Sequence, residues 1–345
     1  MNPNALFLAG TDLLSEVLWS AGMRRLWRPP LDLRLVYYHG VGPGRAPCFR
    51  YLSDEVPRDD FAYHLDYLMN NYRMLSLRDA VDEMVKGKHS PKPICSISFD
   101  DGLSSVYTEA LPLLRERNLP ATVFLDTASV GNGYMTWLHL TSYLLSEFGV
   151  RRLAELFNKL KSDQLPAAPD TEAALLAWYK AHYEANFESD LLGNALAELE
   201  LDMAEIAAEQ SIYLNWENIE EMKTCGFSFS SHTKNHAPLG RFSASRHREA
   251  EIKDAFEVMR ERGQDVDFVS LPFGMKTDYG DSAVSCALAA GHAFVLEVGN
   301  GVNYSDTALS SKVLARVALG AVQSKASRLY SAIEVRPLLK SKIKT

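Results

Sequence analysis

The chain has 345 residues, of which 47% are hydrophobic and 23% are charged, as is usual for a globular protein with a large buried core. Its formal net charge of −8 at pH 7 argues against a nucleic-acid partner, because phosphate binding requires a basic face. The four cysteines (Cys48, Cys95, Cys225 and Cys286) have no paired spacing, so we expect free thiols rather than a disulfide framework.

Residues 1–30 predict an N-terminal amphipathic helix, over about residues 6–27. Its candidate apolar positions are Leu13, Leu14, Val17, Leu18 and Met23, and it is followed by Arg24, Arg25 and Arg28. The segment lacks the pattern of a signal peptide, and no apolar run in the chain is long enough to span a membrane, so we expect a cytoplasmic protein. Two interpretations of the helix remain open. It packs on the rest of the protein, or it lies on a membrane surface with its arginines toward anionic lipid.

Beyond residue 30, apolar strands alternate with amphipathic helices in two stretches. The first predicts strands at 33–38, 93–99 and 121–126, and helices at 60–72, 78–86 and 105–118. The second predicts strands at 227–230, 266–271, 292–298 and 312–317, and helices at 216–225, 244–262 and 282–290. Repeated strand-then-helix units favour an α/β fold with a parallel sheet covered by helices.

Residues 137–211 interrupt this alternation. They are rich in Leu, Ala and Glu, and they predict three or four inserted helices with a hinge-like loop at 164–170. We expect most aromatic side chains of this region to pack between helices: Trp137, Trp178, Tyr179, Tyr183, Phe187 and Tyr213. Tyr134 and Trp137 also follow a strand end, and these two are candidate sugar-binding residues.

Two short motifs provide the material for a metal site. Asp100, Asp101 and Gly102 follow an apolar strand, and His232 and His236 are four residues apart. If they lie on a helical turn, the two imidazoles project from the same side, and a carboxylate from a neighbouring strand end completes a three-ligand set. Adjacent aspartates at a strand end point in different directions, so one can bind metal while the other accepts a proton. Taken singly, each motif is more often a turn or a packing feature.

The two motifs and their surroundings resemble the polysaccharide deacetylases with chitooligosaccharide deacetylase homology. Ser98 to Gly102 matches that family's Thr/Ser-Phe-Asp-Asp-Gly motif, and Ser231 to His236 matches its Ser-His-Ser/Thr-x-x-His motif. The likeness covers roughly residues 33–136 and 212–320. It implies an irregular (β/α) barrel over residues 31–345, with the helical insertion inside it.

The resemblance also implies roles for single residues. Asp100 would be the general base, and Asp101, His232 and His236 would hold a divalent metal, with zinc as the first choice and cobalt, nickel or manganese as others. Pro272, Phe273 and Gly274 resemble a third motif, whose backbone N–H beside the aromatic residue stabilises the oxyanion. Pro272 joins Tyr134 and Trp137 as a candidate substrate-binding residue.

This sequence departs from the family pattern at two places. Ser270 stands where an arginine often orients the base, and no C-terminal Leu-x-His supplies the usual general acid. Arg316 would replace that arginine, although a structural ion pair is an equal interpretation. His39 resembles the acid histidine of a circularly permuted branch that acts on exopolysaccharides. The alternative for His39 is a buried histidine bonded to a backbone carbonyl.

The function implied is metal-dependent removal of an N-acetyl group from an amino sugar in a bacterial-type surface polysaccharide or glycolipid precursor. O-deacetylation and deformylation use the same catalytic groups, and both remain alternative reactions for this protein. A glycan-binding scaffold without catalysis is the alternative from another class.

Overall fold

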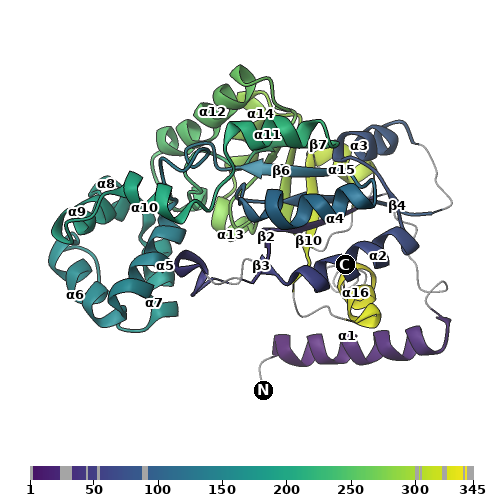
Figure 1. The fold of residues 1–345 in the computed structure, drawn as a ribbon, viewed down its shortest axis with the longest axis horizontal. Helices are drawn as coiled ribbons and strands as arrows, with labels where there is room; N and C mark the ends of the chain where they lie inside the picture. The colour runs from purple at the N-terminus through teal and green to yellow at the C-terminus, as the bar shows by residue number, and fades with distance from the viewer. Residues whose placement is uncertain are drawn as a thin grey trace.

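A computed structural model describes residues 3–23, 33–43, 46–52, 55–87, 92–299, 303, 305–320, 325–336 and 339 (Figure 1). Among these residues, seven parallel strands form the closed barrel that the sequence predicted. In barrel order they are β1 (Leu33–Tyr38), β10 (Val313–Ala318), β9 (Phe294–Val298), β8 (Phe268–Ser270), β7 (Phe227–Ser231), β6 (Ala121–Leu125) and β5 (Ile94–Phe99).

Strand β1 closes the barrel, because it pairs with β5 on one side and with β10 on the other. Tyr38 lies opposite Phe99 of β5, and Val36 lies opposite Val317 of β10. The short strand β4 (Arg73–Met74) pairs with the first residues of β5, outside the seven-stranded ring. Both β1 and β5 are buried along their whole length, as expected for parallel strands covered on both faces.

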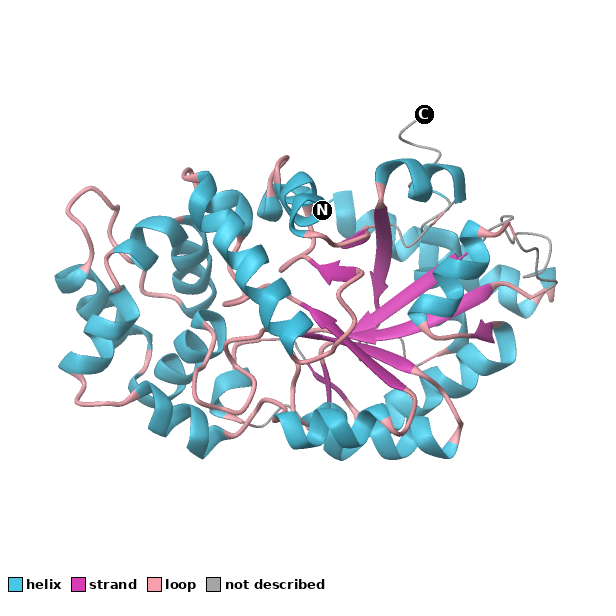
Figure 2. Cartoon of the chain, turned by 90° about the horizontal axis from the view of Figure 1, so that it is seen from above, coloured by secondary structure: helices cyan, strands magenta, loops and turns pink. Residues whose placement is uncertain are grey.

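Helices surround the strands on the outside of the barrel (Figure 2). They are α2 (Arg58–Asn71), α3 (Leu77–Val85), the π-helical turn η3 (Val106–Ala110) with α4 (Leu111–Glu116), α11 (Trp216–Lys223), α12 (Ser245–Glu261), α13 (Lys276–Tyr279), α14 (Ala283–Ala290) and α15 (Ser305–Ser311). Smaller elements are β2 (Gly40–Val41), which pairs with β3 (Glu55–Val56), and the 3-10 turns η2 (Pro47–Phe49) and η4 (Leu239–Arg241).

The insertion forms a helical lobe beside the barrel (Figure 1). All of residues 137–211 are described, and they contain six helices rather than the three or four predicted: α5 (Trp137–Phe148), α6 (Val150–Leu160), α7 (Glu172–Ala181), α8 (Tyr183–Glu188), α9 (Leu191–Glu198) and α10 (Met203–Gln210). Gly149, with a φ of 76°, separates α5 from α6. The predicted loop at 164–170 lies between α6 and α7. The six aromatic residues expected to pack between helices are all buried except Phe187, which is 45% exposed.

The N-terminal helix α1 (Pro3–Ser20) packs against the C-terminal helix α16 (Ala326–Tyr330) and the π-helical turn η6 (Ser331–Val335). Leu18 is buried in this contact, and the ring of Trp19 lies 6.0 Å from that of Tyr330. The predicted end of the helix and the three arginines that follow it lie outside the described residues. None of the helices in the described part of the chain is both long and apolar enough to cross a bilayer.

Candidate active site

The predicted site residues come from different strands but meet at one end of the barrel. Asp100 and Asp101 follow β5, His232 follows β7, and His39 follows β1. In a barrel of parallel strands, the carboxyl ends all open on the same face, where active sites assemble. The barrel therefore brings these side chains together, although His39 and His232 are 193 positions apart in the chain.

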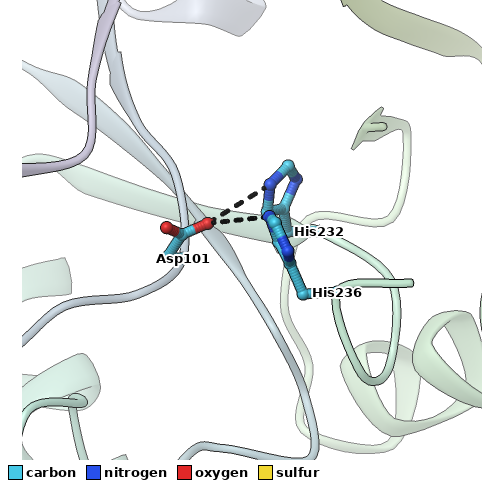
Figure 3. A group of neighbouring side chains, drawn as sticks. All are labelled: Asp101, His232 and His236. Atoms are coloured by element: carbon cyan, nitrogen blue, oxygen red, sulfur yellow. Dashed lines mark ion pairs between the residues drawn. The ribbon is translucent and has the colours of Figure 1, made fainter. Parts of the chain in front are cut away.

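Asp101, His232 and His236 form a compact group of three buried side chains (Figure 3). The Nε2 atoms of both histidines lie 3.4 Å from the same oxygen, Oδ1 of Asp101. One ligand atom from each residue lies within 4.8 Å of the other two. These are the ligand types that zinc prefers, in the number found at open catalytic sites.

Protonation and hydrogen bonding prepare the three side chains to bind a cation. His232 Nδ1 donates to the carbonyl oxygen of Ser270 at 2.8 Å, so the lone pair of its imidazole is on Nε2, facing Asp101. Burial lowers the pKa of His236 to about 3, because burial outweighs the attraction of Asp101. Burial alone would raise the pKa of Asp101, but the nearby histidines, His236 first, hold it far below its usual value.

A divalent metal fits this donor set. Oδ1 of Asp101 is buried and makes no hydrogen bond within the described part of the chain, although two imidazole nitrogens approach it. An ionised carboxylate and two neutral imidazole lone pairs that converge in a buried space require a positive partner. The group is therefore suited to hold a cation.

The helical turn predicted for the two histidines is wrong. Strand β7 ends at Ser231, and residues 232–238 form a loop. Thr233 and His236 have left-handed backbone conformations, with φ of 71° and 55°. Glu251 of α12 fixes this loop, because its carboxylate accepts from the backbone N–H of Asn235 at 2.9 Å and from its side-chain amide at 2.6 Å. The histidines converge through this strained loop and not through helical spacing.

Asp100, next to Asp101 in the chain, pairs with Arg316. The guanidinium donates to both carboxylate oxygens at 2.7 Å, and to the hydroxyl of Ser270 at 2.5 Å. Arg316 has no exposed surface. Burial would raise the pKa of Asp100, but the charge of Arg316, with that of His232, holds it below its usual value. Arg316, from β10, thus contacts both Asp100 and Ser270. Ser270 stands at the position where the family pattern often has an arginine.

His39 is half-buried at the end of β1, and its ring lies 5.7 Å from that of Tyr37. The backbone N–H of Asp100 donates to the carbonyl of Tyr38 at 2.9 Å, which ties the two strand ends together. His39 is close enough that its charge lowers the pKa of both Asp100 and Asp101. Its role as an acid stays a prediction.

Phe273 adopts a left-handed backbone, with a φ of 61°. The following Gly274 also has a positive φ, of 63°, and a Cβ there would lie 2.6 Å from the backbone nitrogen of Val298. The Phe273 ring packs edge-on against His236, with centroids 4.8 Å apart. Pro272, before it, is buried. The strained turn thus lies directly against His236, one of the predicted metal ligands.

The helical insertion contacts both loops of the site. Trp137, at the start of α5, donates from Nε1 to the carbonyl of His236 at 3.0 Å and is only 3% exposed. Lys180 of α7 lies 3.6 Å from the centroid of the Phe273 ring and pairs with Asp278 at 2.9 Å. Trp137 therefore contacts the backbone of His236, a predicted metal ligand, while Tyr134 is half-buried in the loop before α5.

Three further residues near the site were not singled out in the sequence. Lys180 and Glu251 belong to helices, and no local sequence pattern reveals that these helices pack against the site. Asp126 directly follows β6, and neither of its buried carboxyl oxygens has a hydrogen-bond partner among the described residues. Burial raises its pKa well above the usual range, and the charges of Asp101 and Asp100 raise it further. The sequence feature that could have identified Asp126 as a site residue is its position at the end of a predicted strand.

Part of this chain is similar in sequence to known proteins. The sequence model of the polysaccharide deacetylase family matches residues 87–163, which include Asp100 and Asp101. YxkH of Bacillus subtilis (strain 168), a proposed polysaccharide deacetylase, is 29% identical over 119 residues. That match spans 34% of this chain and 39% of YxkH.

Solved structures share the fold at low sequence identity. The Streptococcus pyogenes deacetylase PplD, in complex with acetate, aligns over 89% of this chain and all of its own, with a TM-score of 0.56 and 16% identity. IcaB from Ammonifex degensii aligns over 88% of this chain and 98% of its own, with a TM-score of 0.54 and 17% identity. A de-N-acetylase from Aggregatibacter actinomycetemcomitans aligns over 87% and 99%, with a TM-score of 0.54 and 14% identity. The barrel is the fold that these deacetylases share, and the match to the polysaccharide deacetylase family over residues 87–163, with the similarity to YxkH, adds a resemblance in sequence over part of the chain.

Proposed function

We propose that this protein is a metal-dependent hydrolase that removes the acetyl group from the nitrogen of an amino sugar, in a surface polysaccharide or its glycolipid precursor. One observation carries the proposal. A buried group of three metal-ligand side chains adjoins a second aspartate, Asp100, which is held ionised by Arg316. A glycan-binding scaffold would need neither the ligand group nor the paired aspartate.

Asp101, His232 and His236 would hold the metal. Zinc suits two imidazoles and a carboxylate, and cobalt, nickel and manganese accept the same mixed ligands. A divalent metal bound there would polarise the amide carbonyl and lower the pKa of an attacking water.

Asp100 would accept the proton of the attacking water at its carboxylate. Its lowered pKa keeps it ionised at neutral pH, and Arg316 fixes its orientation through two hydrogen bonds. The backbone N–H next to the Phe273 side chain would donate to the developing oxyanion, and His39 would protonate the leaving amine. The Aggregatibacter neighbour is a de-N-acetylase, which supports an amide rather than an ester as the bond hydrolysed.

The test is acetate release by the purified full-length protein. The protein is stripped with a chelator, reloaded with zinc, and given N-acetylglucosamine oligomers or an O-acetylated glycan of similar size. We expect zinc-dependent acetate release from the N-acetylated oligomers. Asp100→Asn should bind zinc normally but lose activity by a factor on the order of 100, because only the proton acceptor changes.

Two results would contradict the proposal. Faster release from the O-acetylated glycan would reassign the enzyme as an esterase. Binding of both glycans without release of acetate, with zinc present, would favour the scaffold interpretation.

A further inference from the structure

The side chain of Asp126 is a buried carboxyl without a hydrogen-bond partner in the described part of the chain. It directly follows β6 and is 1% exposed, as deeply buried as the predicted metal ligand His232. Both Oδ1 and Oδ2 are buried, and neither bonds to a described residue. Burying a polar group without a partner costs free energy, so a carboxyl in this state indicates a function that requires it.

The alternation of side chains along β6 directs Asp126 into the barrel. Successive side chains of a strand point to opposite faces. The centroid of the Phe124 ring lies 5.3 Å from the guanidinium carbon of Arg316, the residue that holds Asp100 inside the barrel. Leu125 belongs to the apolar cluster that α4 helps to form, outside the barrel. Asp126 is two residues after Phe124 and so faces the inside, at the end where the site lies.

The groups near Asp126 are of the kinds that bind a sugar. Burial raises the pKa of Tyr134, a predicted sugar-binding residue, and the charges of Glu251 and Asp126 raise it further. The charge of Asp126 also contributes to the raised pKa of Tyr183, after burial. The charge of Asp101 in turn acts on Asp126. The unpartnered carboxyl is therefore near both a predicted metal ligand and aromatic side chains, and a polar group among aromatic rings is typical of ligand sites.

We propose that Asp126 binds a hydroxyl group of the sugar that carries the acetyl group, and so determines specificity for a sugar. This inference rests on the sugar substrate proposed above. A hydroxyl donates to a carboxylate and accepts from a neutral carboxyl, so the contact forms in either protonation state. The charges of Asp100 and Asp101 repel an anion from this position. A hydroxyl is also neutral, so it costs less to bury beside the carboxyl than a cation does.

The kinetic test compares an N-acetylglucosamine oligomer with 4-nitrophenyl acetate, an activated ester that has no sugar hydroxyl. Both are given to the full-length protein loaded with zinc. Asp126→Ala should raise KM for the oligomer about tenfold, as expected for one lost hydrogen bond to the substrate. Hydrolysis of the ester and the zinc content should not change. Asp126→Asn, which keeps a side chain that can bond a hydroxyl, should raise KM less than Asp126→Ala.

Protein stability separates sugar binding from a structural role. Because the carboxyl is buried without a partner, both Asp126 variants should keep or raise the urea midpoint of unfolding. The matched control is Glu334→Gln. Glu334 is a buried carboxylate near the amino end of β1, where it accepts from Arg34 and Tyr72. The control should unfold at a lower urea concentration but keep the KM of the unmodified protein.

Three results would overturn the role of Asp126. They are an unchanged KM for the oligomer in Asp126→Ala, equal losses on the oligomer and the ester, and a lower urea midpoint in both Asp126 variants. Failure of the proposed catalytic function gives a different result, in which the unmodified protein binds the oligomer in titration calorimetry but releases no acetate. The affinity then decides, since it should fall about tenfold in Asp126→Ala, and equal affinities would overturn the proposal.

Discussion

Arg316 and Asp100 are 216 positions apart in the chain, yet two hydrogen bonds of 2.7 Å join their side chains. Arg316 comes from β10 and Asp100 follows β5, with β1 between the two strands. The base and the residue that orients it therefore depend on closure of the barrel. Breaking such a buried pair from one side costs about 3–5 kcal/mol, because the remaining charge is left without its partner.

Replacing Arg316 with methionine should move the acidic limb of the activity profile to higher pH. Loss of the guanidinium raises the pKa of Asp100, so a higher pH is needed to ionise it. The ion pair stabilises the fold above the unfolded pKa of Asp100, and that stability is lost as the pH falls through the lower folded pKa. Activity and urea unfolding measured against pH check both effects.

Arg316→Lys, which keeps the positive charge, should shift the activity profile less than Arg316→Met. Identical profiles in the unmodified protein and both variants would refute the role of Arg316 in keeping Asp100 ionised.

Metal content tests the ligand group. The purified protein should contain about one divalent ion per chain, and His236→Ala should lose most of it together with activity. Elemental mass spectrometry of the purified protein measures the number of metal ions per chain. His292→Asn is the matched control, since His292 is a buried histidine that is not part of the ligand group, and it should keep its ion. Full occupancy in the His236 variant would show that another side chain is the ligand.

His39→Ala should slow the reaction according to the leaving group. A sugar amine needs a proton to depart, whereas an activated phenol does not, so the loss should be large for N-acetyl sugars and small for activated acetate esters. The ratio of kcat values for the two substrates is the measurement. Equal losses on both substrates would assign His39 to packing and leave the acid to another group.

Trp137→Phe should weaken metal binding without unfolding the lobe. The variant removes the hydrogen bond to the His236 carbonyl and keeps an aromatic ring to stack on Tyr179, whose ring lies 5.1 Å away. One such bond is worth about 1 kcal/mol, which corresponds to roughly a fivefold loss of zinc affinity, measured by competition with a chelating dye. The matched control is Trp178→Phe, which removes a similar bond to Pro166 elsewhere in the lobe. If both variants bind zinc equally well, Trp137 does not position the ligand loop.

The metal-free protein should lose stability in weak acid because of His292. Its Nδ1 donates to the carbonyl of Val266 at 2.7 Å, and burial lowers its pKa to about 4. The unfolded chain, with a histidine pKa near 6.5, binds the proton first, so stability falls as the pH drops from about 6.5 to about 4, by about 3 kcal/mol. Urea unfolding at several pH values measures this slope. His292→Asn should flatten it, and an unchanged slope would assign the acid sensitivity to other groups such as His236.

The sequence predicted a parallel sheet because strands buried on both faces appear as apolar runs, such as 33–38 and 94–99, and the resemblance to the deacetylase family implied that the sheet closes into a barrel. Other features had no local signal. Strand β4 has two residues, too few to show a period, and the positive φ of His236 leaves no trace in the spacing of the two histidines. Lys180 contacts Phe273 although the two residues are 93 positions apart in the chain, and no local sequence pattern reveals a contact between such distant residues. The six helices of the lobe were undercounted because some are separated by a single residue, Gly149 between α5 and α6 and His182 between α7 and α8, and so have one continuous composition.

The position of β1 between β5 and β10 also determines when the molecule can finish folding as it is synthesised. Asp101, His232 and His236 follow β5 and β7, so the three side chains can assemble on a partial sheet once the chain has emerged from the ribosome through His236. Arg316 emerges 80 residues later. Until then β1 presents one unpaired edge, and Asp100 is without its counter-ion. A nascent chain stalled before β10 would thus have a complete set of metal ligands, an open barrel, and an edge strand exposed to aggregation.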